Sequence, residues 1–152
     1  MSMRYWLMKT EPDEFSIDHL AKKKVEPWTG VRNYQARNFM RDGMQVGDGV
    51  LFYHSSCAEP GVAGIAEVGS AAYPDPTQFD RKSDYYDPAS RRDEPRWVLV
   101  DVKFKRKLKR VITLTELKDR PELEGFALLH RGNRLSVLPV TKAHWDFILS
   151  LE

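Results

Sequence analysis

The chain has 152 residues, about the length of one domain, and its 41% hydrophobic and 30% charged residues exclude wholesale disorder. A net charge of +2 does not by itself indicate a polyanionic partner, and the lone Cys57 excludes an internal disulfide. No apolar run reaches the ~18 residues of a membrane span, and the features of a signal peptide are missing. We therefore expect one domain over residues 1–152 of a soluble, cytoplasmic, monomeric protein.

Four segments have the residue pattern of β-strands, which is a short apolar run or an alternation of apolar and polar residues. Residues 5–8 are aromatic and apolar, as in a buried strand, while residues 50–55 and 62–68 each follow a glycine-containing turn. Glycines around the third segment suggest a bulge or a close backbone approach. In residues 96–108 valines fall on one face and lysines on the other, which is the clearest strand pattern.

Three hydroxyl residues, Ser16, Thr113 and Thr141, stand where helix N-caps are expected. The last of these helices carries an apolar stripe that includes Trp145 and Ile148, which we assign to the core. Short strands in a meander, with a few helices at the ends, predict an α+β domain built on a small barrel or a strongly curved sheet.

Residues 73–95 form a long segment rich in Pro, Asp and Tyr, without any periodicity. Loops of this length without secondary structure are uncommon in compact domains and are usually functional or disordered. The aromatic residues of this segment argue against disorder, because aromatic side chains anchor loops onto cores.

The chain lacks the motifs of common enzyme classes. Its four histidines and Cys57 do not have metal-ligand spacing, and there is no phosphate-binding loop, dinucleotide-binding turn or nucleophile elbow. On a strand, His54 and Cys57 point to opposite faces, which argues against a Cys–His catalytic pair. We expect no catalytic residue, no metal and no cofactor.

Residues 28–38 (WTGVRNYQARN) combine an aromatic ring, two arginines and several amides. Amide side chains offer a donor and an acceptor together, which suits the edge of a nucleobase, while arginines suit phosphates and tryptophan suits stacking. A polar turn held by internal hydrogen bonds is the alternative interpretation, and composition does not decide between the two.

Three further segments are candidates for contact with nucleic acid. Polar and aromatic residues gather at the strand end 53–55 and before a strand at 131–136, and pockets form where such groups converge. Residues 103–110 are strongly basic, and Lys103, Lys105 and Lys107 share one strand face. That stripe suits a phosphate backbone, but it equally suits a solvated edge that prevents strand pairing.

The sequence resembles the EVE domain family. The similarity is carried, in chain order, by residues 6–12 (WLMKTEP), 28–38, 47–48 with 52–55 (GD and FYHS), 95–97 (PRW) and 134–140 (RLSVLPV). The family belongs to the PUA-like superfamily, beside the YTH, ASCH and SRA domains. The resemblance implies a curved, partly closed β-barrel of about five to six strands flanked by short helices, with a pocket at one end.

Relatives in that superfamily bind RNA or DNA, several of them by capturing a modified base. The resemblance therefore implies a reader of a modified base in RNA or DNA, on a single-stranded or locally open substrate, since unstacking a base costs least there. Two alternatives are a hydrolase-type enzyme acting on modified nucleotides and a scaffold that binds partners other than nucleic acid. A eukaryotic member would be nuclear and a bacterial one cytoplasmic.

In the expected site Trp28 stacks on the base, Asn33, Gln35 and Ser55 read its polar edge, and Arg37 and Arg134 hold phosphates. We expect residues 9–11, 28–38, 53–55 and 131–136 to converge on one cavity. The complete set of expected binding residues is Lys9, Thr10, Trp28, Asn33, Tyr34, Gln35, Arg37, Asn38, Tyr53, His54, Ser55, Arg131, Arg134 and Ser136, with Lys103, Lys105 and Lys107 as a separate backbone tract.

Overall fold

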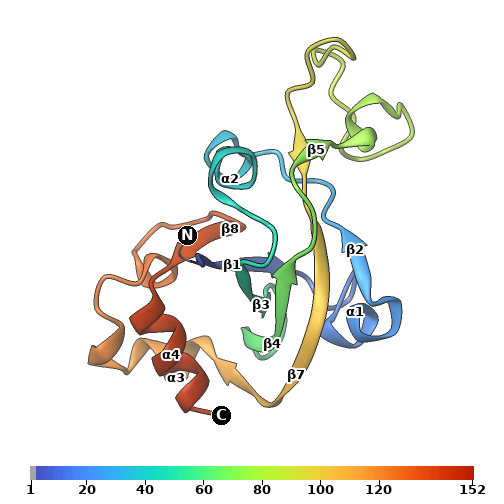
Figure 1. The fold of residues 1–152 in the computed structure, drawn as a ribbon. Coiled ribbons are helices and arrows are strands. Elements are labelled where there is room, and N and C mark those ends of the chain that lie inside the picture. Colours follow the sequence, from blue (N-terminus) through green and yellow to red (C-terminus); the bar gives the residue numbers. More distant parts are fainter. Residues whose placement is uncertain (1–2) are drawn as a thin grey trace.

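A computed structural model describes residues 3–152, and Figure 1 shows their arrangement. The strands are β1 (Tyr5–Thr10), β2 (Val25–Pro27), β3 (Gly49–His54), β4 (Gly61–Val68), β5 (Tyr73–Pro74), β6 (Val98–Leu99), β7 (Asp101–Thr113) and β8 (Val137–Val140). The α-helices are α1 (Ile17–Lys23), α2 (Tyr34–Asn38), α3 (Leu114–Lys118) and α4 (Lys142–Ser150). Within residues 3–152 no helix is both long enough and apolar enough to cross a membrane.

Six strands form one strongly curled sheet in the order β2-β7-β4-β3-β1-β8, and long β7 follows the curl around the open half-barrel (Figure 1). The predicted α+β class with a curved, partly closed sheet is thus confirmed. The predicted meander is wrong, because β1 pairs with β3 in parallel. A parallel pair needs a crossover connection, and the segment with α1, β2 and α2 supplies it.

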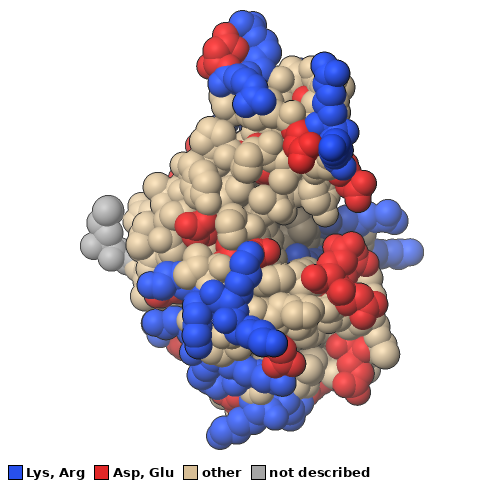
Figure 2. Space-filling model, turned by 90° about the vertical axis from the view of Figure 1, so that its right-hand side faces the viewer, with Lys and Arg blue, Asp and Glu red and all other residues tan. Residues whose placement is uncertain are grey.

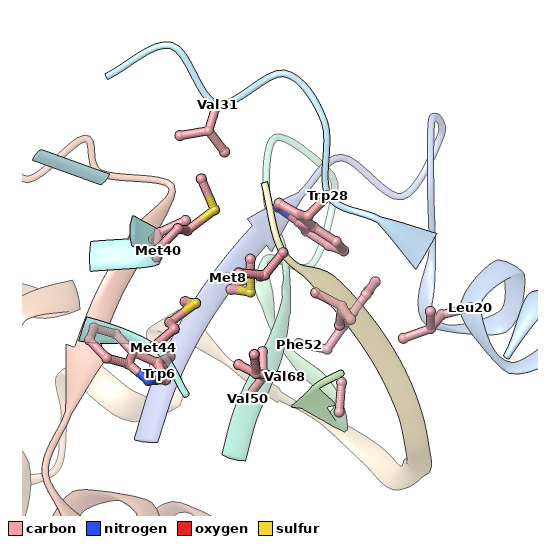
Figure 3. Close-up of a cluster of buried hydrophobic side chains, with 14 of the residues drawn as sticks. Trp6, Met8, Leu20, Trp28, Val31, Met40, Met44, Val50, Phe52 and Val68 are labelled. Carbon is pink, nitrogen blue, oxygen red and sulfur yellow. The ribbon is translucent and has the colours of Figure 1, made fainter. Parts of the chain in front are cut away.

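Both faces of the central strands are buried, and two hydrophobic clusters share them. In β1, Trp6 and Met8 belong to the cluster inside the curl, which Figure 3 shows, and Leu7 belongs to the cluster on the other face. The second cluster also contains Ile148 of α4, with Trp145 packed against it, which confirms the assignment of that stripe to the core. This two-sided burial explains why β1 and β3 are continuous apolar runs rather than alternating ones.

The three predicted helix N-caps are confirmed. The hydroxyl of Ser16 accepts a hydrogen bond from the backbone N–H of His19 at 3.2 Å. Thr113 and Thr141 accept from the N–H groups three residues later, at 3.2 and 3.1 Å. Local sequence therefore sets where α1, α3 and α4 begin.

The predicted single strand over residues 96–108 is wrong in its boundaries. Its first part is β6, which pairs with β5 in a separate two-stranded ribbon, and β7 begins at Asp101 and continues to Thr113. Val100, which lies between the two strands, accepts a hydrogen bond from Trp28 N–H at 3.0 Å. The backbone N–H of Asp101 donates to the Ser70 hydroxyl at 2.8 Å. These contacts replace ladder hydrogen bonds where the chain passes from the ribbon to the main sheet.

The predicted close approach at the glycines of β4 is confirmed. A Cβ atom at Gly64 would lie 2.3 Å from Ile17 Cδ1, so the missing side chain lets α1 pack directly on the sheet. The pairing of β4 with β7 also shifts register at two places, between Val62 and Gly64 and between Ile65 and Ala66. Such bulges increase the local twist and so contribute to the curl.

Residues 75–97 form a lobe that projects from the β5–β6 ribbon, away from the main sheet (Figure 1). Gln78 is fully buried at its base. Its amide nitrogen donates to the carbonyls of Asp75 and Trp97 at 2.7 and 2.8 Å, and its oxygen accepts from the Ser90 hydroxyl at 2.6 Å. The aperiodic segment is therefore held by polar side chains rather than by strand or helix ladders.

Candidate functional site

A cavity of about 550 Å³ opens where the two edges of the curled sheet approach each other. One wall continues from β2, one edge strand, and the opposite wall comes from the end of β1 and the residue before β8, the other edge strand. In Figure 2 the surface is hollowed below the lobe. The lining residues are Lys9, Thr10, Glu11, Glu14, Phe15, Glu26, Pro27, Trp28, Thr29, Gly30, Val31, Ser55, Ser56, Tyr85, Arg134 and Ser136.

The strand pairing explains why distant segments meet at this cavity. Because β1 and β3 are parallel, their carboxyl ends lie at the same edge, where Ser55 N–H donates to the Thr10 carbonyl at 2.9 Å. On the other side of β1, Lys9 N–H donates to the Ser136 carbonyl at 2.8 Å. Polar residues 46 and 81 positions further along the chain, Ser55 and Ser136, therefore flank Lys9 and Thr10.

Trp28 belongs both to the cavity wall and to the core. Its side chain is 7% exposed and packs edge-on against the rings of Phe52 and Phe15, with centroid distances of 5.7 and 6.3 Å. Figure 3 shows it at the upper end of the inner cluster, near Phe52 and Met8. An indole held this way is a rigid apolar wall for the cavity.

Lys9 is the half-buried cation of the cavity. Burial lowers the pKa of its ammonium group, and no carboxylate among the described residues offsets that effect. Its Nζ lies 6.0 Å from the centre of the Tyr53 ring, which is a weak cation–π contact. An ammonium in this position can donate up to three hydrogen bonds to an acceptor that enters the cavity.

The rest of the rim has charges of both signs. Glu11, Glu14 and Glu26 supply carboxylates, and Arg134 supplies a second cation. Figure 2 shows acidic side chains beside the hollow. Glu26 is ion-paired with Lys23, so part of this acidic charge is compensated. A mixed rim of this kind favours a ligand with both donors and acceptors over a simple anion.

Six of the fourteen expected binding residues line the cavity, and the structure brings them together from three of the four predicted segments plus the last. They are Lys9, Thr10, Trp28, Ser55, Arg134 and Ser136. The hydroxyl of Thr10 donates to the carbonyl of Phe15 at 3.0 Å, so its first role is to hold the turn that follows β1.

The polar residues of α2 do not line the cavity, because the chain turns outward after buried Val31. Asn33 caps α2 by accepting from Ala36 N–H at 3.0 Å, as the polar-turn interpretation requires. Tyr34 stacks on Trp97 at 4.8 Å on the outer surface, with the Arg37 guanidinium 4.7 Å from its ring centre. Gln35 and Asn38 are exposed on the same helix.

Tyr53, His54 and Arg131 also lie outside the cavity lining. Tyr53 is buried in the second hydrophobic cluster, and burial, followed by the nearby Cys57, raises the pKa of its phenol to about 12. The Nε2 atom of His54 accepts from Ile17 N–H at 3.1 Å, and burial lowers the pKa of this imidazole. Arg131 is exposed in the turn before β8.

The basic stripe lies on exposed positions of β7. Glu67 faces two of its members, with distances of 3.7 Å to Lys103 Nζ and 3.5 Å to Lys105 Nζ. Lys107 pairs with Asp18 at 3.0 Å. Because one carboxylate serves two ammonium groups, the stripe keeps a net positive charge.

Sequence reasoning missed several lining residues, above all Tyr85 of the lobe and Glu14 and Glu26 on the rim. The one available signal for Tyr85 was the length of the aperiodic segment that contains it. Among residues 3–152 no group of three or more His, Cys, Asp or Glu is arranged to hold a metal ion.

The fold and the cavity together define a small α+β half-barrel domain with a polar and aromatic pocket between its sheet edges. The model of the EVE domain matches residues 4–151, and the chain belongs to this family.

Named relatives support the assignment. Human thymocyte nuclear protein 1 is 45% identical over 167 residues, covering 97% of this chain and 73% of the relative. A solved structure of a hypothetical protein from Leishmania major is 53% identical, with a TM-score of 0.94 over 99% of this chain and 94% of that one. The crystal structure of human THYN1 protein in complex with DNA containing 5-methylcytosine is 44% identical, with a TM-score of 0.93 over 97% and 96% of the chains.

Proposed function

We propose that this chain is a nucleic-acid-binding module that reads a modified base, with DNA containing a modified cytosine as the first ligand to test and RNA as the alternative. The similarity to a human protein crystallised with 5-methylcytosine DNA supports this choice. For a bacterial chain of this type the site of action is the cytoplasm, and for a eukaryotic one it is the nucleus.

The observation that carries the proposal is the half-buried Lys9 ammonium, which faces a cavity instead of a carboxylate. Desolvating a cation without a partner is costly, so its retention is best explained by an acceptor that arrives from outside. A carbonyl oxygen of an extruded pyrimidine is such an acceptor. The hydroxyls of Ser55 and Ser136, on either side of Lys9, are placed to complete the polar edge.

A base enters such a cavity only after it leaves the helical stack, which costs a few kcal/mol and least in single-stranded or mismatched substrates. Stacking on protein side chains returns about 1–3 kcal/mol per base. The remaining affinity must come from the backbone, to which the rim cation Arg134 is directed in our proposal. We therefore expect open substrates to bind more tightly than a fully paired duplex.

The test is a binding panel of oligonucleotides that are identical except for one base, which is cytosine, 5-methylcytosine or another modified base. Fluorescence anisotropy at one fixed salt concentration should give a lower Kd for at least one modified oligonucleotide than for its unmodified control. The Lys9→Met variant should lose about 1.5–3 kcal/mol of this binding, the usual contribution of a hydrogen bond to a charged group.

Lys142→Met is the matched control, because Lys142 is exposed on α4 outside the cavity and the substitution removes the same charge. Equal affinity for all members of the panel would contradict the proposal. Turnover of a modified nucleoside in the same samples would instead favour the hydrolase alternative.

We also propose that Lys103, Lys105 and Lys107 form a second, sequence-independent contact with phosphates. Ion pairs between exposed side chains are weak, so phosphates can displace Glu67 and Asp18 from these lysines. Replacing all three lysines with Gln should weaken binding to every oligonucleotide alike. The slope of log K against log salt should decrease in magnitude by about 1–2.

A control variant with Lys22, Lys24 and Lys142 replaced by Gln has the same net charge but leaves β7 intact. If both triple variants change the salt slope equally, the effect is one of overall charge, and the stripe is the solvated edge of the alternative interpretation.

A further inference from the structure

The lobe supplies one side chain to the cavity, and that side chain is an aromatic ring. Tyr85 lines the cavity together with Trp28, although the two residues are 57 positions apart in the sequence. Tyr85 is 40% exposed, whereas Trp28 is almost completely buried among core rings. Of these two aromatic rings, Tyr85 therefore has the larger surface available to a ligand.

The ring of Tyr85 rests on the backbone of Gly30. A Cβ atom at Gly30 would lie 2.7 Å from Cε2 and Cζ of the ring and 3.0 Å from Cε1, which places that point above the ring face. Gly30 also has a φ of +89°, which disfavours any other residue there. One face of the ring is thus occupied, and a ligand can stack only on the other.

An ion pair holds this arrangement in place. Arg32 donates to the Tyr85 carbonyl from Nε and Nη2 at 3.0 and 2.9 Å, and its guanidinium carbon lies 5.5 Å from the Tyr85 ring centre. Asp75 is fully buried and accepts from Arg32 Nη1 at 3.1 Å and from Gly30 N–H at 2.8 Å. The same carboxylate therefore fixes both the ring's support and the residue that holds its backbone.

A surface tyrosine does not need this support for folding. Burying a carboxylate costs free energy that the ion pair only partly returns, so a buried charge is a costly way to fix a loop. A ring that is already immobile, by contrast, loses little conformational entropy when a ligand stacks on it. The buried pair and the seated ring together indicate preparation for a flat ligand.

We propose that Tyr85 is the stacking residue of the cavity, with its free ring face against the extruded base, and that Asp75 is a positioning residue acting through Arg32 and Gly30. The proposal rests on the function proposed above and names the aromatic contact within it. Trp28 then forms the fixed apolar wall beside the base rather than the stacking surface.

The experiment compares Tyr85→Ala, Tyr85→Phe and Tyr73→Ala in the oligonucleotide panel. Tyr73 is a matched control, since it is 38% exposed at the start of the ribbon and is not part of the cavity lining. Tyr85→Ala should weaken binding of the preferred modified oligonucleotide roughly 5- to 150-fold, the range that corresponds to one stacked base. Tyr85→Phe and Tyr73→Ala should bind as the parent does, and thermal melts should show all three folded.

Parental affinity in Tyr85→Ala would overturn the proposal while the proposed function stands. An equal loss in Tyr85→Ala and Tyr85→Phe would also overturn it, because the hydroxyl would then make the contact. If the parent chain shows no preference for any modified base, the proposed function fails and this inference fails with it.

A double-mutant cycle tests the role of Asp75. Asp75→Asn should lower the ratio of modified to unmodified affinity in the parent background but should leave it unchanged in the Tyr85→Ala background, because two residues that act through one ring are not additive. A further decrease in the double variant would show that Asp75 acts independently of Tyr85, against the proposal.

Discussion

Trp28→Ala is expected to lower the free energy of unfolding by about 3–5 kcal/mol, the usual cost of truncating a large buried aromatic side chain. The reason is its edge-on packing against Phe52 and Phe15, which leaves no neighbouring side chain able to fill the space. Chemical denaturation followed by circular dichroism measures the change. The same variant also loses one wall of the cavity.

Trp28→Phe is the matched control, because it keeps an aromatic ring at this position and should cost much less stability. Binding must be measured where Trp28→Ala is still folded. A variant as stable as the parent would show that the indole is a peripheral lid rather than part of the core.

Asp48→Ala is the second large expected effect, with a loss of about 3 kcal/mol or more in the free energy of unfolding. The buried carboxylate accepts hydrogen bonds from the Trp6 indole at 3.0 Å and from the backbone N–H groups of Arg4 and Gln45 at 3.1 and 2.9 Å. Removing it leaves three donors without their acceptor between β1 and the turn before β3. Each buried donor left unsatisfied costs roughly 1–3 kcal/mol.

Asp42→Ala is the corresponding control, since Asp42 is exposed and pairs with its neighbour Arg41. It should change the stability by less than about 0.5 kcal/mol. Equal effects of the two substitutions, measured by denaturant titration, would contradict the role assigned to Asp48.

The elements that the sequence predicted well are those determined by local pattern. The apolar runs of β1 and β3 and the caps at Ser16 and Thr141 depend on residues within a few positions of each other. The parallel pairing of β1 with β3 depends instead on which strands meet across the sheet, and no local pattern contains that information. This is why the curved α+β sheet was predictable and its strand order was not.

The candidate site divides along the same line. Lys9, Trp28 and Ser55 were found because each stands at the end of a recognisable strand. Asn33 and its neighbours in α2 were grouped with Trp28 because they are adjacent in sequence, but the bend after Val31 separates them from it. Tyr85 reaches the cavity through contacts with residues more than fifty positions earlier, and an aperiodic segment gives no indication of such partners.

The open half-barrel has two free strand edges, which in many proteins invite pairing with a second copy of the chain. Each edge strand here includes a proline, Pro27 in β2 and Pro139 in β8. Proline has no backbone N–H, so it interrupts the row of donors that an incoming strand would need. A fully closed barrel would not need this protection, but its two edges could not stand apart around a cavity. The prolines thus allow the sheet to remain open at its mouth with less risk of edge-to-edge aggregation.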